Sequence, residues 1–497
     1  MVATVSVGFV TPMTGLVSDH LLAILTLALA LAIIGTRYAY RFGVPVILFF
    51  VFAGVLAGSE GVGGIEFENY PLAQLVGTLS LVVILFDGGF HTDRKLFRIG
   101  LGPGMVLATL GTFAAAALVG AFAVVVFGFS WTEGLLLGSV VSSTDAAAVF
   151  ATLRKQKLAL KKRVQSVLEI ESSSNDPPAV YLTVALTALL LRGQTPGWSL
   201  LGGFLLQMGL GLALGLLGGY GAAWMLKRLR FDLPSLYPLL ALVAAGFVFA
   251  ATNLVYGSGF LAVYVAAVVL GNEALPFKTL ISRALDGFSW LAQILMFFTL
   301  GLLVFPSRLW EVAVPAIGLG FFLIFVARPL ATALLLTRSG LDLRERALVS
   351  WAGLRGAVPI ILAIYPLMQG VERSHTIFNT VFFVVILSVL VQGTTVGWLA
   401  RRLRLHLPAQ AVPPVHVELA SWQVFDGEIM LYRVESGGGA GRALRELDLP
   451  PDVVAMLIVR GDQLIPPRGS TALEPGDFVY FFAKEKDRPA LDRLFQS

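Results

Sequence analysis

Long apolar runs constrain this chain more than any other feature. A helix that crosses the hydrocarbon core of a bilayer needs about 20 predominantly apolar residues, and thirteen runs of roughly that length are present. They lie near residues 19–36, 44–58, 72–90, 102–127, 132–151, 164–191, 200–226, 234–255, 258–271, 282–305, 311–336, 346–368 and 377–399. Only 13% of the residues are charged, against about 25% in ordinary soluble domains. The sequence predicts an all-α polytopic membrane protein with thirteen transmembrane helices.

The loops between these runs predict the orientation. Cytoplasmic loops are enriched in Lys and Arg. If the N-terminus lies outside, the inner loops hold 22 basic residues, whereas the outer loops hold only Arg192, Arg308 and Arg373. We therefore expect an outer N-terminus and a cytoplasmic C-terminus. Because the basic residues are spread over short loops, the net charge of +5 does not indicate nucleic-acid binding, and the absence of cysteine excludes disulfides and thiolate metal sites.

Seven of the ionisable residues inside the predicted spans stand out. A charge at the centre of a bilayer costs about 3 kcal/mol on insertion scales, so such residues are functional candidates. They are Asp87, Asp145, Glu169, Glu171, Asp176, Arg328 and Arg355.

The segment "EIESSSNDPPAV", residues 169–180, holds three of these carboxylates. In a helix Ser172, Asn175 and Asp176 share one face. Their oxygens suit a partly dehydrated alkali cation, while removal from water favours the protonated form of a carboxyl group. Cation and proton would then compete for one site at Asp176. Thr144 and Asp145 would add oxygens if their helix unwinds.

The remaining charges have alternative interpretations. Arg328 either pairs with Glu171 or serves as a structural tether, and Arg355 either neutralises the carbonyl ends of broken helices or approaches Asp145. Asp87 is either an accessory site residue or an interfacial one. We expect Glu169 to be either a residue of the cytoplasmic entrance or a packing residue, and we expect Pro177 and Pro178 to bend the chain after the site.

The character of the chain changes near its C-terminal end. Residues 1–404 are predicted to form the transmembrane domain, 405–415 a linker, and 416–497 a small cytoplasmic α+β domain. Strands are expected at "VHVEL" and "FVYFFA", a hairpin in "RGDQLIPPRG", and a terminal helix in "DRPALDRLFQ". Within the membrane part, "SSTDA" and "GLRGA" lie in spans seven apart, which indicates an inverted repeat with paired broken helices.

The order and spacing of "SSTDAAAVF", "EIESSSNDP", "ARPL" and "GLRGA" resemble the NhaP-type cation/proton antiporters. The tail "VVAMLIVRGDQLIPPRGSTALEPGDFVYFFA" resembles the C-terminal subdomain of TrkA/RCK-type regulatory proteins. Together with the extended "SSTDAAAVF" form, this tail is similar to the bacterial potassium/proton branch.

The resemblance implies a six-helix core with two crossed broken helices, a homodimer, and a place in the bacterial inner membrane. It makes Asp176 the carboxylate that binds cation or proton, with Asn175, Ser172, Thr144 and Asp145 at the ion site. It makes Glu171 and Arg328 a structural ion pair and Arg355 the basic residue of the second broken helix. A proline often follows the Thr-Asp pair in this family, whereas Ala146 stands here, so the shape of that break is left open.

The expected function is electroneutral exchange of one K+ for one proton, with K+ extruded from the cytoplasm. Na+ is the alternative cation, and a channel gated by an RCK-like domain is the alternative class. A channel predicts a TVGYG-type filter, for which Gly219-Tyr220-Gly221 is the only near match. A non-transporting ion sensor would not need so many buried titratable groups. We expect no enzymatic activity and no cofactor, and a nucleotide, a cation or no ligand at the tail.

Overall fold

The computed structural model describes residues 46–156, 158–408, 428–434, 439–461 and 463–495, together with positions 26, 30 and 33–35. Two compact units divide the chain. The first is Met1–Glu273 with Leu280–Pro408, and the second is Ala409–Ser497 with Ala274–Thr279. Most of the expected first span and the whole expected strand "VHVEL" lie outside the described residues.

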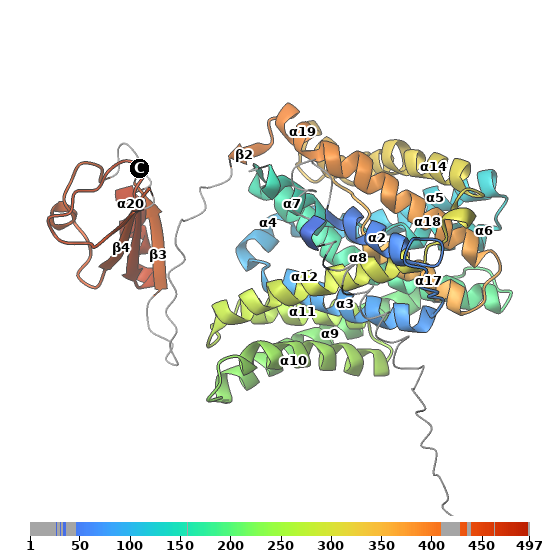
Figure 1. Cartoon of the computed structure of the whole chain (residues 1–497), viewed down its shortest axis with the longest axis horizontal. Coiled ribbons are helices and arrows are strands. Elements are labelled where there is room, and N and C mark those ends of the chain that lie inside the picture. The colour runs from blue at the N-terminus through green and yellow to red at the C-terminus, as the bar shows by residue number, and fades with distance from the viewer. Residues whose placement is uncertain are drawn as a thin grey trace, which may run out of the picture. The chain divides into compact units, whose positions relative to one another are not determined.

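The first unit is a bundle of helices (Figure 1). Its first half contains α2 (Val46–Ala57), α3 (Tyr70–Phe90), α4 (Arg94–Val106), η1 (Leu107–Gly111), α5 (Thr112–Phe127), α6 (Trp131–Val140), α7 (Ala146–Lys155), α8 (Lys162–Leu191), α9 (Ser199–Arg228) and α10 (Leu236–Leu254). The second half contains α11 (Gly259–Gly271), α12 (Lys278–Leu302), α13 (Pro306–Leu309), α14 (Ala313–Phe322), η2 (Leu323–Ala327), α15 (Arg328–Leu335), α16 (Leu343–Trp351), α17 (Ala357–Met368), α18 (Ser374–Ser388), η3 (Val389–Gly393) and α19 (Thr394–Arg402).

Seven of the described helical segments are long and apolar enough to cross a membrane. They are Tyr70–Phe90, Arg98–Phe127, Ser199–Arg228, Leu236–Leu254, Lys278–Leu302, Ala313–Leu335 and Ser374–Arg402. Other expected spans differ for physical reasons: α2 and α11 are short, α8 carries many charges, and two spans are each broken into a pair of half-length helices. The total of thirteen stays a prediction.

One order of helices occurs twice along the chain. A helix with a π-bulge is followed by a broken helix and then by a long helix, first as α4–η1–α5, α6/α7 and α8, and again as α14–η2–α15, α16/α17 and α18–η3–α19. π-Bulges are rare and frequently mark functional sites. The repeated order supports an internal repeat, and its inversion stays a prediction.

Helix α8 runs unbroken from Lys162 to Leu191, although Pro177 and Pro178 lie in its middle. The expected bend therefore does not end the helix. A proline inside a helix removes one i to i−4 hydrogen bond, so the carbonyl groups of Ser173 and Ser174 lose their helical donors. Packing of α8 against α4 and α6 holds the helix together across this point.

Glycines bring α2 and α12 into backbone contact. A Cβ atom on Gly54 would lie 2.1 Å from the carbonyl oxygen of Phe298, and one on Gly301 would lie 2.2 Å from that of Val51. No larger residue fits at either position without displacing backbone. The two helices are therefore in the close packing that small residues allow between membrane helices.

The second unit contains a four-stranded antiparallel sheet in the order β3-β6-β4-β5. Its elements are β3 (Glu428–Arg433), η4 (Leu444–Glu446), β4 (Val454–Arg460), β5 (Gln463–Ile465), β6 (Phe478–Ala483), η5 (Glu485–Asp487) and α20 (Arg488–Phe495). The expected strand "FVYFFA", the hairpin and the terminal helix correspond to β6, β4–β5 and α20. Leu491 and Phe495 of α20 pack with Tyr432 and Phe481 in one hydrophobic core.

Candidate ion-binding site

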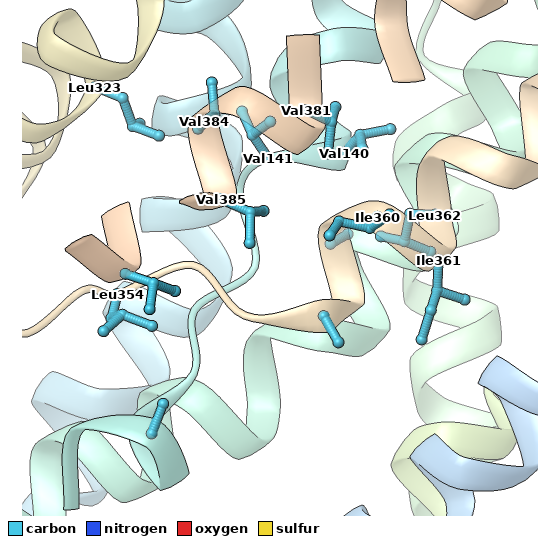
Figure 2. Packing of buried hydrophobic residues seen from close by; sticks show 14 of the residues in the cluster. Val140, Val141, Leu323, Leu354, Ile360, Ile361, Leu362, Val381, Val384 and Val385 are labelled. Atoms are coloured by element: carbon cyan, nitrogen blue, oxygen red, sulfur yellow. The ribbon is translucent and has the colours of Figure 1, made fainter. Parts of the chain in front are cut away.

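Two helix breaks meet inside the first unit. Five residues separate α6 from α7, and five separate α16 from α17. The backbone N–H of Asp145 in the first break donates to the carbonyl oxygen of Leu354 in the second at 2.7 Å. Figure 2 shows both extended segments and the hydrophobic side chains around them, among them Val141 and Leu354 on the segments themselves. The two breaks are thus joined by a backbone hydrogen bond inside a hydrophobic core.

Local chemistry explains why α7 begins without a proline. The Asp145 side chain accepts a hydrogen bond from the N–H of Ala148 at 3.0 Å, which is the N-cap arrangement that starts helices. On the opposite segment, a Cβ atom on Gly356 would lie 2.1 Å from Oδ2 of Asp145. Glycine at this position lets the capped turn and the second break approach each other.

Arg355 holds the carbonyl end of the first break. Its side chain is 1% exposed, and its Nη1 donates to the carbonyl oxygens of Ser142 and Ser143, the latter at 2.8 Å. Carbonyl groups at a helix C-terminus carry partial negative charge. The guanidinium therefore binds carbonyl groups just after the end of α6, and its expected role in neutralising the broken helix stays a prediction. Its backbone N–H donates to Ser388 Oγ at 2.9 Å, and Ser388 donates to Gln392 at 2.6 Å.

Helix α8 brings its polar residues against the first break. Ser172 Oγ accepts from the N–H of Ala146 at 2.8 Å and donates to the carbonyl oxygen of Thr144 at 2.9 Å. Asn175 Nδ2 donates to Thr144 Oγ1 at 2.6 Å. The Asn175 side-chain oxygen has no hydrogen-bond partner among the described residues. Ser172 and Asn175 thus connect α8 directly to the first break.

Asp176 is buried beside the same break, with 4% of its surface exposed. Its Oδ1 accepts a hydrogen bond from the hydroxyl of Ser143. The described contacts give this carboxyl group no ion pair with a basic residue. Sequence reasoning singled out Asp176 but missed Ser143, although the two adjacent serines before Thr144 were a visible signal.

Glu171 and Arg328 form a buried ion pair in the same bundle. Arg328 Nη1 lies 2.5 Å from Glu171 Oε1, and Nη2 donates to Oε2 at 2.8 Å. Such a two-pronged contact is among the strongest that side chains make. Arg328 directly follows the π-bulge η2, and a Cβ atom on Gly353 would lie 2.5 Å from its Nε. Glu171 is therefore occupied by arginine and separate from Asp176.

A cavity of about 800 Å³ extends to the first break. Asp145, Ser172 and Asp176 line it, and so do Asp87 and Glu169. Its lining continues to Arg154 near the end of α7 and to Asp286 in α12. Glu169 accepts from Gln165 at 2.9 Å and lines the cavity; its place at a cytoplasmic entrance stays a prediction.

Asp87 belongs to a cluster that sequence reasoning missed. Nδ1 of His91 lies 3.1 Å from Asp87 Oδ1, and its Nε2 lies 2.7 Å from Ser282 Oγ of α12. Asp286 approaches the same group. Hydrogen bonding to Asp87 raises the pKa of His91, which follows the end of α3, to about 9. The i, i+4 spacing of Asp87 and His91 could have predicted their contact. The contacts with Ser282 and Asp286 of α12 could not be predicted, because that helix is distant in the sequence.

Comparisons with known proteins agree on one family. Residues 24–402 match the model for the transmembrane sodium/hydrogen exchangers, and residues 429–496 match the TrkA-C domain. The K(+)/H(+) antiporter NhaP2 of Shewanella baltica is 40% identical over 470 residues, covering 94% of this chain and 81% of that protein. The K(+)/H(+) antiporter NhaP of Alkalimonas amylolytica is 39% identical over 474 residues, covering 94% and 82%.

Solved structures show the same fold for the membrane part. The sodium proton antiporter MjNhaP1 of Methanocaldococcus jannaschii, solved at pH 8, matches with a TM-score of 0.67 at 24% identity. The match covers 77% of this chain and 98% of that chain.

Proposed function

Because the chain belongs to the sodium/hydrogen exchanger family, we propose that it is a secondary antiporter that exchanges K+ for protons. The observation that carries the proposal is the position of Asp176. This carboxyl group is buried and lines a cavity that reaches the helix break. Its partner is a serine hydroxyl, whereas the partner of Glu171 is an arginine. It is the carboxyl group that a cation and a proton can share.

Exchange follows from competition at that carboxyl group. A bound cation requires the ionised carboxylate, whereas a bound proton removes the charge that attracts the cation. If the site can change its exposure from one side of the membrane to the other only with an ion or a proton bound, each such change carries one cation or one proton. Asn175 does not titrate, and Glu171 stays paired with Arg328. The exchange is therefore electroneutral, with one cation for one proton.

Potassium is the cation favoured by the relatives. Two proteins named as K(+)/H(+) antiporters are 39–40% identical over 94% of this chain. The sodium proton antiporter is 24% identical, so it supports the fold alone. We assign outward movement of K+ driven by inward movement of protons, and Na+ is the competing cation that the test must include.

The proposed arrangement has thirteen spans in the bacterial inner membrane, with the N-terminus outside. Residues 1–404 form the transmembrane domain, 405–415 the linker, and 416–497 a cytoplasmic regulatory domain; the TrkA-C match supports the last assignment. The proposed ion ligands are Asp176, Asn175, Ser172, Thr144 and Asp145, with Asp87 accessory. We assign a homodimer as the working form, and a nucleotide or a cation as the regulator of the tail.

Proton movement in proteoliposomes tests the proposal. Addition of K+ is expected to drive protons through the wild type, and Asp176→Asn is expected to abolish this response. Glu273→Gln serves as control, because that carboxylate lies in a surface ion pair with Lys227. Na+, Li+ and Rb+ are tested in turn. A stronger response to Na+ would reassign the cation, and proton movement that persists in Asp176→Asn would refute the site.

The same vesicles distinguish an antiporter from a channel. Electroneutral exchange is expected to proceed at one rate whether or not a membrane potential is imposed at matched gradients. Cation flux that follows the potential without proton movement would indicate a channel.

A further inference from the structure

The serine hydroxyls near Asp176 differ in what they are free to do. The Ser172 hydroxyl donates to the Thr144 carbonyl and accepts from the Ala146 N–H, so it is occupied in holding the break. The Ser143 hydroxyl instead points its donor at the Asp176 carboxylate. Its side chain is 1% exposed, yet it lines the cavity.

The backbone of Ser143 is fixed from behind. Its carbonyl oxygen accepts from Arg355 Nη1 at 2.8 Å, and the peptide lies in the extended segment between α6 and α7. A hydroxyl has one donor and two acceptor lone pairs and can rotate between these uses. Because the backbone of Ser143 is hydrogen-bonded in place, its hydroxyl can rotate beside Asp176 at a low cost in free energy.

Resting on the proposed function, we propose that Ser143 is a further cation ligand and a determinant of cation affinity, whereas Ser172 also holds the break in position. Without a cation the Ser143 hydroxyl satisfies the carboxylate. With a cation it turns its lone pairs to the ion, as oxygen ligands do when they replace a hydration shell. The Ser143 hydroxyl thus changes from a hydrogen-bond donor to a cation ligand, and the backbone of the site does not move.

The test compares serine variants by the K+ concentration that gives half-maximal proton movement. Ser143→Ala is expected to raise this concentration about tenfold, the effect of losing one contact to a charged group, with the maximal rate within about twofold of wild type. Ser172→Ala, which also removes the two hydrogen bonds that hold the break, is expected to lower the maximal rate and the melting temperature as well. The control is Ser139→Ala, because that buried hydroxyl donates to Leu135 within α6.

Each outcome decides one point. An inactive wild type would refute the proposed function itself. An active wild type with an unchanged half-maximal concentration in Ser143→Ala would refute the ligand role and leave the function standing. If Ser143→Ala fails to fold, Ser143→Cys decides, since a thiol of similar size is a weak donor and acceptor. A raised half-maximal concentration in that variant supports the role, and an unchanged one overturns it.

A second inference rests on a small sheet at the surface of the first unit. Strand β1 (Leu158–Leu160) lies in the connector between α7 and α8, and it pairs antiparallel with β2 (His406–Pro408), which follows α19. Ala159 lies opposite Leu407. The N–H of Lys161 donates to the carbonyl oxygen of Leu405 at 3.1 Å and extends the pairing. Leu160 and Leu405 are 3% and 1% exposed, so the ribbon is anchored in the bundle.

This ribbon joins the start of the C-terminal segment to the ion site. Asp145 caps the start of helix α7, and α8 carries Asp176. The connector between these two helices is the segment to which β2 is paired. Resting on the proposed regulatory role of the C-terminal domain, we infer that the β1–β2 ribbon is the mechanical link through which that domain would act on the two site helices. A force on the chain after Pro408 reaches α7 and α8 through paired backbone.

A double-mutant cycle in the full chain tests the link. Leu407→Pro removes an N–H from the ribbon, and Leu407→Ala is its control because the Leu407 side chain is 45% exposed. A flexible Gly-Ser insertion of about ten residues after Gln410 slackens the tail without removing it. Each change is expected to alter the maximal exchange rate about threefold, and the combination is expected to equal either one alone. Effects that add independently, or an insertion without effect, would overturn the link.

Discussion

The guanidinium of Arg328 grips both carboxylate oxygens of Glu171, with both side chains at least 94% buried. Removing one partner from such a pair leaves an uncompensated charge and costs about 3–5 kcal/mol. Glu171→Ala is therefore expected to destabilise the protein strongly. The double replacement Glu171→Leu with Arg328→Met is expected to be less destabilising, since no buried charge remains. Thermal unfolding in detergent measures the stability of both variants. An equal loss of stability in the single and the double variant would contradict the role of the unpaired charge.

Gly356 is expected to tolerate no side chain. A Cβ atom there would lie 2.1 Å from Oδ2 of Asp145, so Gly356→Ala must displace the cap of α7 and the break. We expect exchange in proteoliposomes to fall at least about tenfold. Gly246→Ala in α10 is the matched control, because nothing lies within 4 Å of its added Cβ. Wild-type exchange in Gly356→Ala would show that the break adapts.

The contacts of His91 predict a pH-dependent contribution to stability. Its pKa is raised to about 9, chiefly by its hydrogen bond to Asp87. A raised folded-state pKa means that the stabilisation is fully present below the ordinary value of about 6.5 and is lost as the pH rises through about 9. The melting temperature of His91→Gln should therefore lie below that of wild type at pH 6, and the gap should shrink towards pH 10. A gap that is constant with pH would contradict this origin.

In the second unit, Arg460 binds Asp477 through two hydrogen bonds of 2.9 and 2.8 Å, and the Asp477 side chain is 1% exposed. Lysine cannot reproduce this planar two-pronged contact. Arg460→Lys in the full chain is expected to make the tail several-fold more sensitive to limited proteolysis. Lys486→Ala is the control, since that side chain is 64% exposed. Equal cleavage rates in Arg460→Lys and wild type would show that a positive charge alone is enough to bind Asp477.

Intramembrane charges made much of the site predictable from sequence. Asp145, Asp176 and Arg355 stand out because burying an ionisable group is costly, and the structure places all three around the helix breaks. The family resemblance then supplied their expected roles. The described helices also follow the apolar runs closely, because hydrophobic length is a strong signal in membranes.

Contacts between distant segments were not predictable. The approach of Asp286 to His91, the pairing of β1 with β2, and the hydroxyl of Ser143 on Asp176 depend on tertiary packing. The continuity of α8 through Pro177 and Pro178 is of the same kind, since neighbouring helices compensate for a local preference. Two serines of identical chemistry, Ser143 and Ser172, differ only in what surrounds them.

The glycine contact between α2 and α12 limits how the cavity can close. Val46 and Ile47 of α2 and Met296 and Phe297 of α12 line the cavity, while Gly54 and Gly301 press the two backbones together. With no side chains between them at this point, the helices cannot slide past one another without separating. We therefore expect α2 and α12 to move together in any change that closes the cavity on this side.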